Sequence, residues 1–315
     1  MVRFALRRLL VLLVALLAVS VVTFLIPYLS GGDPVRTILR SRVSGQALDP
    51  AAVEALRREL GLDRPLVVQY LEWLGRAVRG DFGLSFTSRT PVDQLLGSAL
   101  GVSLTLTVIA LGLAFVAALP LGTIAALRPG KRVDTAVTFV TQSFVAVPEY
   151  WLAPVLVLVF SQQLGWLPSA GWRTPAYLVL PAVTLALRPL AYFTQVTRAA
   201  MVDVLRAPYI TAARARGLSR PQTLVRHALR NGLLPVMTLF SLWFAGLLGG
   251  SVVVEVIFAV PGMGQLVYKA VVNHDIPIIQ AGILSIVALA VLITTFTDVL
   301  YATVNPAVRL RDGSV

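Results

Sequence analysis

Long apolar stretches alternate with short polar ones along most of the chain. Six apolar stretches reach 18 residues or more, which is the length at which a helix can cross the hydrocarbon core of a membrane. They lie at residues 9–29, 101–127, 135–163, 177–201, 233–258 and 278–304. The pattern therefore predicts an all-α polytopic membrane protein with six transmembrane helices.

Two polar stretches interrupt this pattern, one at 30–98 and one at 202–232. We expect four parts. They are an N-terminal segment with the first helix (1–29), a helical insert (30–98), a core of five helices that contains the second polar stretch (99–305), and a short tail (306–315). No room is left for a second globular domain.

Within the insert, residues 49–80 have the pattern of two short helices. The second runs from Pro65 to Gly80, with Val68, Leu71 and Leu74 at helical spacing. Neither helix has enough apolar surface to fold alone. We expect them to lie against the outer ends of the membrane helices or against a protein that arrives from outside.

The placement of charge sets the expected orientation, because Lys and Arg accumulate on the cytoplasmic side of membrane helices. Three arginines precede the first span, and alternation through six spans then places 202–232 and both termini inside. The inside segments together hold 15 cations and three acids, whereas the insert holds nine cations and eight acids. We therefore expect the insert to be extracytoplasmic.

Composition narrows the possible chemistry. The net charge is +12, but only 13% of residues are charged and the mean hydropathy is +0.81, whereas soluble domains carry about 25% charged residues. The sequence has no cysteine, no G-x-x-x-x-G-K-[ST] phosphate loop, and two histidines far apart. We expect no catalytic residue, no metal site and no cofactor in this chain.

The polar interval 206–232 carries six arginines, one histidine and no acid. Its alanine-rich first half predicts a short helix that ends at Gly217, and Ser219 can cap a second helix with Pro221 in its first turn. Such an interval could be a membrane-proximal basic face, a nucleic-acid-binding surface or a docking element for a cytoplasmic partner. Docking is favoured, because both ends lead directly into membrane helices that a push on the turn would move.

The segment TAARARGLSRPQTLVRHALRN resembles the cytoplasmic coupling loop of ATP-binding-cassette (ABC) importer permeases. That loop usually has Glu-Ala-Ala, three residues and Gly. Here Ala212 and Ala213 are followed by three residues and Gly217, as in that loop, and Thr211 stands in place of Glu. Of the loop's second half only Leu229 is kept.

Other stretches resemble the dipeptide and oligopeptide branch of these permeases. They follow in the same order along the chain: ELGLDRPLVVQYLEWL, GDFGLSF, VEVIFAVPGMGQLVYKAVVNHDIPIIQ and DVLYATVNPAVRLRD. The resemblance therefore covers nearly the whole chain.

The resemblance implies a type I ABC importer permease in a bacterial inner membrane. With a second permease this chain would form the pore for di- or oligopeptides that an external solute-binding protein delivers. Two cytoplasmic ATPases would bind ATP and Mg and receive the 206–230 loop. No nucleic acid takes part, and the remaining surface faces membrane lipid. Glutathione or nickel is the alternative cargo.

The same resemblance assigns coupling to the ATPases to a set of residues in that loop. They are Thr211, Ala212, Ala213, Arg214, Arg216, Gly217, Leu218, Ser219, Arg226 and His227. From another class, an ion-gradient-driven secondary transporter would show inverted repeats and more acids at the membrane midplane. We find no clear repeat.

Glu149 and Arg188 fall inside predicted spans, where each charge costs about 2.5–3.5 kcal/mol at a helix centre. Each must therefore face protein or a water-filled cavity. Counted from the inner side, they lie at similar depths, so they can pair if their helices adjoin. The two readings are a structural ion pair and a lining of the translocation pathway.

Glu255, Pro261 and Gly262 lie in a stretch that the resemblance assigns to an external gate. Asp298, near the inner end of the last helix, is expected to cap a helix or pair with a cytoplasmic arginine. Several prolines are predicted to kink their helices: Pro148, Pro154, Pro181 and Pro189. Gly246 and Gly250 form a G-x-x-x-G pair that allows close helix contact.

Overall fold

The computed structural model describes residues 2–29, 51, 54, 57–58 and 62–304. In these residues the chain is helical and has no strand, apart from one isolated bridge between Leu84 and Pro91. The helices form two units, which are described separately below: Met1–Ser103 with Pro261–Thr295, and Leu104–Val260 with Phe296–Val315.

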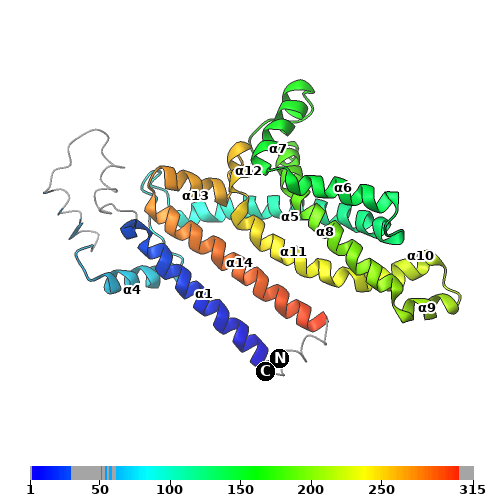
Figure 1. Ribbon diagram of the computed structural model, residues 1–315. Helices are drawn as coiled ribbons and strands as arrows, with labels where there is room; N and C mark the ends of the chain where they lie inside the picture. The colour runs from blue at the N-terminus through cyan, green and yellow to red at the C-terminus, as the bar shows by residue number, and fades with distance from the viewer. Residues whose placement is uncertain (1, 30–50, 52–53, 55–56, 59–61, 305–315) are drawn as a thin grey trace. The chain divides into compact units, whose positions relative to one another are not determined.

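The first unit contains α1, α4, the start of α5, α13 and most of α14 (Figure 1). Their bounds are Val2–Leu29, Leu66–Ala77, Val92–Leu127, Met263–Val272 and Ile276–Val304. Its core joins one face of α5 to α13 and α14 through Val92, Leu96, Met263 and Ile278. Ser103 accepts a 2.8 Å hydrogen bond from the backbone N–H of Met263, so it satisfies one of the free donors at the start of α13.

The second unit contains the rest of α5, followed by α6, α7, η1, α8, α9, α10, η2, α11 and α12. After α5 their bounds are Arg132–Ala146, Glu149–Leu156, Val157–Gln163, Ala176–Arg206, Pro208–Ala215, Arg220–Thr223, Leu224–Leu229, Arg230–Gly250 and Val252–Ile257. Helix α8 is the centre of this unit, since it packs against α6, α7 and α11.

Aromatic rings fill the centre of the second unit. The rings of Phe115, Phe193 and Phe240 lie with centroids 5.8–6.3 Å apart, and Phe193 is fully buried. Below them α5 and α8 approach closely at Gly122, where an added Cβ would lie 2.6 Å from the carbonyl oxygen of Thr194 and the Cβ of Thr197. A small residue at this point allows the two backbones to touch.

The expected six spans correspond to the long apolar helices of the structure. Four described helices are long and apolar enough to cross a membrane alone, and two bent pairs bring the number to six. The single helices are Leu9–Leu29, Val92–Leu127, Ala176–Arg206 and Ile276–Thr297, and the pairs are Arg132–Ala146 with Glu149–Gln163 and Arg220–Leu233 with Pro235–Gly250. The fold class predicted from the sequence is confirmed.

Two expected spans are not single helices. The span predicted at 135–163 breaks at Val147, which is extended, and its halves meet at 99°. Pro148 accounts for the break, because the residue before a proline is driven out of the helical region. The span predicted at 233–258 divides at Ser251 into α11 and α12.

The three other prolines behave differently. Helix α8 continues as one helix through Pro181 and Pro189, whereas Pro154 is followed by the π-helical turn η1. A π-helical turn is one way in which a helix accommodates a position that lacks a backbone donor. The second predicted helix of the insert is confirmed as α4. The first insert helix lies outside the described residues apart from four positions, and the tail 306–315 lies outside them entirely.

Candidate functional site: a basic elbow and its anchors

The polar interval forms two short helices joined by a sharp turn, here called the basic elbow (Pro208–Leu229; α9, α10 and η2) (Figure 1). Pro208 opens α9, and Gly217, with φ +90°, reverses the chain after it. This conformation is open to glycine and strained for other residues. The helix–turn–helix predicted from the sequence is therefore confirmed.

The start of α10 is held by a capping box. The backbone N–H of Gln222 donates to Ser219 Oγ at 3.4 Å, and the N–H of Ser219 donates to Gln222 Oε1 at 3.1 Å. Pro221 stands in the first turn, where its missing N–H costs nothing. Local sequence alone therefore fixes the second arm of the elbow.

The inner face of the elbow is packed into the second unit. Ile210 and Ala228 are fully buried and form a core with Ala126 and Met201. Gly232, just after the elbow, allows close contact, because an added Cβ would lie 2.7 Å from the sulfur of Met201. The elbow is therefore a tightly seated part of the helices that precede and follow it.

The outer face is small, polar and positive. Most of the expected coupling residues are exposed: Thr211, Ala212, Arg214, Arg216, Gly217, Ser219 and Arg226. Leu218 and His227 are half-buried, and Ala213 is buried beneath the face at 1% exposure. In the described part of the chain no acidic side chain lies within 4.0 Å of Arg214, Arg216 or Arg226.

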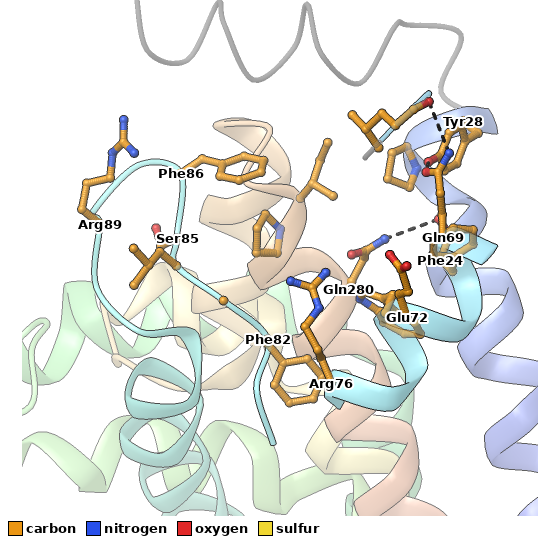
Figure 2. A pocket seen from close by; sticks show the side chains of 17 residues that line it. Phe24, Tyr28, Gln69, Glu72, Arg76, Phe82, Ser85, Phe86, Arg89 and Gln280 are labelled. Atoms are coloured by element: carbon orange, nitrogen blue, oxygen red, sulfur yellow. Dashed lines mark hydrogen bonds between the residues drawn. The ribbon is translucent and has the colours of Figure 1, made fainter. Parts of the chain in front are cut away.

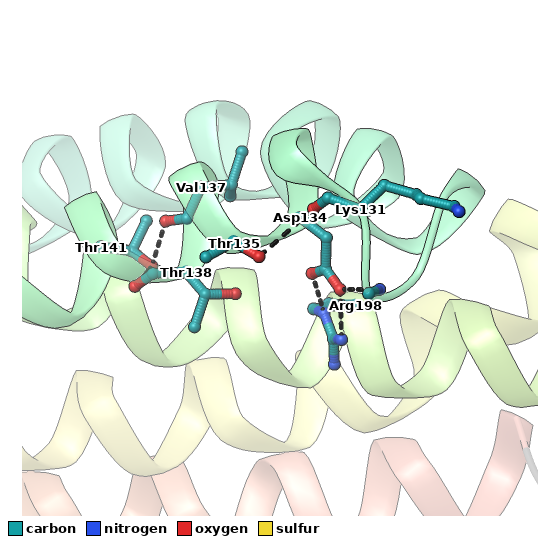
Figure 3. A network of polar contacts seen from close by, with 8 residues as sticks. Lys131, Asp134, Thr135, Val137, Thr138, Thr141 and Arg198 are labelled. Atoms are coloured by element: carbon teal, nitrogen blue, oxygen red, sulfur yellow. Dashed lines mark hydrogen bonds and ion pairs between the residues drawn. The ribbon is translucent and has the colours of Figure 1, made fainter.

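An ion pair that the sequence analysis missed holds a neighbouring loop of the same unit. Arg198 on α8 donates from Nη2 to Asp134 Oδ2 at 2.6 Å and from Nε to Oδ1, while the N–H of Gly130 donates to Oδ2 at 2.7 Å (Figure 3). Asp134 is 3% exposed. The bidentate pair fixes the start of α6 to α8; the only signal in the sequence was one acid among the cations of RPGKRVD.

A second missed residue, Asp275, organises a loop of the first unit. Its carboxylate is 1% exposed and accepts hydrogen bonds from Ser85 Oγ at 2.6 Å and from the N–H groups of Phe86 and Thr87 at 3.1 and 3.0 Å. The N–H of Ser88 donates in turn to Ser85 Oγ at 3.0 Å. Asp275 therefore joins GDFGLSF to the later NHDIP stretch.

The expected pathway charges lie in the second unit. Glu149 begins α7 and is half-buried, and Arg188 on the adjacent α8 is exposed. The two charges interact electrostatically, but within the described residues no ion pair under 4.0 Å joins them. The predicted adjacency of their helices is thus present without a closed salt bridge.

The expected gate residues fall in different units. Glu255 is fully buried in the second unit and accepts a 2.8 Å hydrogen bond from Ser251 Oγ. Pro261 and Gly262 belong to the first unit, where Gly262 is the N-cap of α13. The side chain of Asp298 lies outside the described residues.

The first unit also contains a cavity of about 360 Å³ between α1, α4, the 82–89 loop and the start of α14 (Figure 2). Its walls combine aromatic rings with charged groups, including Tyr28, Trp73, Glu72, Arg76 and Arg89. Glu72 is paired with Arg64, whose Nη1 lies 2.5 Å from Oε1.

Together, the membrane-length helices and the exposed basic elbow define a polytopic membrane protein with an exposed basic turn. The chain belongs to the family of inner membrane components of binding-protein-dependent transport systems. The model of this family matches residues 118–310, and the model of its N-terminal region matches residues 1–107.

Relatives and solved structures agree with this assignment. The chain is 39% identical over 311 residues to the glutathione transport system permease protein GsiC of Escherichia coli K12 and of Shigella dysenteriae, which covers 99% of this chain and all of each relative. The inward-facing MetNI methionine ABC transporter shares the fold with a TM-score of 0.58 and 21% identity over 67% of this chain and 97% of its own. An amino acid ABC transporter solved with histidines shares the fold with a TM-score of 0.51 and 17% identity, over 67% of this chain and 94% of its own.

The protein is therefore a multi-pass inner-membrane permease subunit of an ABC importer, with the type I permease fold. Subunits of this kind leave ATP hydrolysis to partner subunits. The alternative of an ion-gradient-driven secondary transporter is wrong.

Proposed function

We propose that the chain forms, with a second permease, the pore through which a bacterium imports short peptides, a class that includes glutathione. An external solute-binding protein would deliver the peptide, and two ATPases that bind ATP and Mg would drive transport. The main support is the 39% identity along the whole length of a glutathione permease. The branch-specific stretches of the sequence support peptides more generally.

The basic elbow is the element that we assign to the ATPases. Its exposed alanines give α9 a thin profile that suits a cleft. Arg214, Arg216 and Arg226, which have no acidic side chain within 4.0 Å among the described residues, would present positive charge to an acidic partner surface. Its buried inner face contacts α5 and α8, because Ile210 and Ala228 form a core with Ala126 and Met201. A force on the elbow would therefore reach two membrane helices without passing through a flexible linker.

This assignment implies an orientation. The elbow, both termini and the 128–134 loop would be cytoplasmic, and the 30–98 insert would be extracytoplasmic. The excess of cations in the first group of segments supports it. The four-part division at 29, 98 and 305 belongs to the same proposal.

Arg188 and Glu149 are proposed to line the pathway and to meet the charged ends of a peptide. Arg188 supports this role, since it is exposed on a helix whose neighbouring residues are buried, and an exposed charge within a span must face water or protein. Glu255, Pro261 and Gly262 are proposed as parts of the external gate. Because Glu255 is fully buried, it would act through Ser251 and the backbone around it.

Uptake by the assembled importer in liposomes tests the cargo. We expect ATP-dependent accumulation of labelled glutathione or of a labelled dipeptide in the presence of the binding protein, and none of nickel. Glu149→Gln should reduce peptide uptake while leaving assembly intact. Nickel accumulation, or normal peptide uptake by the variant, would contradict the cargo and the pathway role respectively.

Crosslinking tests the coupling role. The chain has no native cysteine, so Ala212→Cys introduces a unique thiol on the outer face of α9. It should form a crosslink with an ATPase subunit that carries a cysteine in its cleft. Arg79→Cys, in the insert, is the matched control and should form none.

A further inference from the structure

Helix α4 leaves an apolar stripe uncovered on the side opposite the cavity. The stripe consists of Val67 and Leu71 in the helix and Val78 at its C-terminal cap, which follow one another at helical spacing. Their exposed fractions are 69%, 59% and 80%. Such a stripe is costly in water, so it requires a partner.

The polar side of the same helix has its own contacts. Glu72 and Arg76 line the cavity of the first unit (Figure 2). Gln69 donates to the carbonyl oxygens of Arg64 and Leu62. The charged and amide groups therefore gather on one side and the valines and leucine on the other. This separation is the pattern of a helix that lies at a membrane surface.

The contacts of α4 with α1 set its depth. Tyr70 shares a 2.8 Å hydrogen bond with Ser20, Trp73 packs against Phe24, and Tyr28 donates to Gln69 at 2.5 Å. The apolar span of α1 ends at Leu29. Ser20 lies nine residues before that end, which is about 14 Å at 1.5 Å per residue.

Half of the hydrocarbon core is about 15 Å thick. A helix whose side chains contact the C-terminal half of a span therefore lies within the thickness of the membrane and not above it. Tyr28, one residue before the end of the span, lies at the level where aromatic side chains mark the boundary between lipid and water. Val22 and Leu29 of α1 are likewise exposed, at 60% and 75%.

We propose that α4 is an interfacial helix, embedded in the leaflet at the C-terminal end of α1, with Val67, Leu71 and Val78 in contact with lipid acyl chains. This assignment needs only that α1 spans the membrane, so it does not depend on the cargo or on which side of the membrane that leaflet faces. The insert would then be anchored to the bilayer as well as to α1.

Spin labelling tests the proposal, because the chain has no cysteine. Nitroxide labels are placed one at a time at Val67→Cys, Leu71→Cys and Val78→Cys in the assembled importer, with cysteine-free partner subunits, reconstituted in liposomes. Accessibility to oxygen, which concentrates in lipid, is compared with accessibility to a water-soluble nickel chelate. Val22→Cys serves as the lipid standard, and Arg76→Cys, on the polar side of the same helix, as the water standard.

We expect the ratio of oxygen to nickel accessibility at the three stripe positions to approach the ratio at Val22 and to exceed the ratio at Arg76 several-fold. A ratio equal to that at Arg76 would show that the stripe faces water and would overturn the proposal. Exclusion of both reagents would also overturn it, because the stripe would then be covered by the second permease, the binding protein or another part of the insert. Quenching of a fluorophore at Leu71→Cys by brominated lipid gives an independent measurement of the same contact.

Discussion

The basic elbow and the loop held by Asp275 use charge in opposite ways. The elbow leaves Arg214 and Arg216 exposed, with no acidic side chain within 4.0 Å in the described residues, while Ile210 and Ala228 are buried beneath. The 82–91 loop is organised by the buried carboxylate of Asp275, which accepts hydrogen bonds from three donors of the loop. The exposed arginines of the elbow are therefore available to a partner, whereas the carboxylate of Asp275 is already occupied by hydrogen bonds within its own unit.

This difference separates an element that awaits a partner from one that is complete in itself. Substitutions in the 82–91 loop should lower stability first and transport only as a consequence. Substitutions of the exposed arginines on the elbow's outer face should lower transport and leave stability unchanged. The four predictions below test that separation, beginning with the largest expected effect.

Asp275→Ala should lower the free energy of unfolding of the first unit by about 3 kcal/mol or more, since it leaves Ser85 Oγ and two backbone N–H groups buried without an acceptor. The melting temperature of the purified importer measures the effect. Asp275→Asn is the matched control, because it keeps one acceptor oxygen and should lose less. An unchanged melting temperature for the alanine variant would show that the loop is ordered by other contacts.

Reversal of charge at the elbow, by Arg214→Glu together with Arg216→Glu, should reduce ATP-driven uptake roughly a hundredfold, which corresponds to about 2.8 kcal/mol, because like charges would then face the partner. The melting temperature of the permease should not change, since both side chains are exposed. Arg214→Lys with Arg216→Lys keeps the charge and is expected to retain most uptake. Normal uptake by the reversed variant would remove the elbow from the coupling interface.

Gly217→Val should cost about 1–2 kcal/mol, because φ +90° is strained for a residue with a branched Cβ. The strain would tilt α10 relative to α9, so uptake should fall even in variants that assemble. Gly217→Asn tolerates positive φ better and should be milder, and Gly246→Ala, where an added Cβ meets nothing within 4 Å, should be neutral. Equal behaviour of the three variants would show that the turn is not constrained.

Ser219→Ala should have the smallest effect, about 1 kcal/mol, through loss of one half of the capping box. Ser219→Asp keeps a capping oxygen and should restore most of the loss. Hydrogen exchange at the start of α10 measures the change directly. Protection that stays the same in the alanine variant would indicate that packing of Thr223 and Ala228 holds this turn without the cap.

The sequence was informative wherever the signals were local. Gly217, Ser219 and Pro221 act on their own turns, so the elbow could be drawn before the structure was known. The apolar runs predicted the six spans, and Pro148 marked the position at which one of them breaks, although the 99° angle between the halves was not foreseen. Burial of Ala213 beneath the elbow was also not foreseen.

The contacts that hold the site in place join residues far apart in the sequence, so local sequence patterns could not predict them. Ser85 and Asp275 are 190 residues apart, and Asp134 and Arg198 are 64 apart. No periodicity links such pairs, since either acid could equally have been a solvated surface charge. The pairing of Glu149 and Arg188 was inferred from depth alone, and the structure brings their helices together without closing the ion pair.

The sequence by itself determined that the chain crosses a membrane, where its helices lie and that a basic turn interrupts them, because hydrophobic length, charge and turn residues act over a few positions. Only the tertiary structure decided which charges are buried and which remain available, because burial depends on what distant segments bring to the same place. It also showed that α4 lies beside the C-terminal half of the α1 span, since that position depends on Tyr70, Trp73 and Gln69 meeting α1.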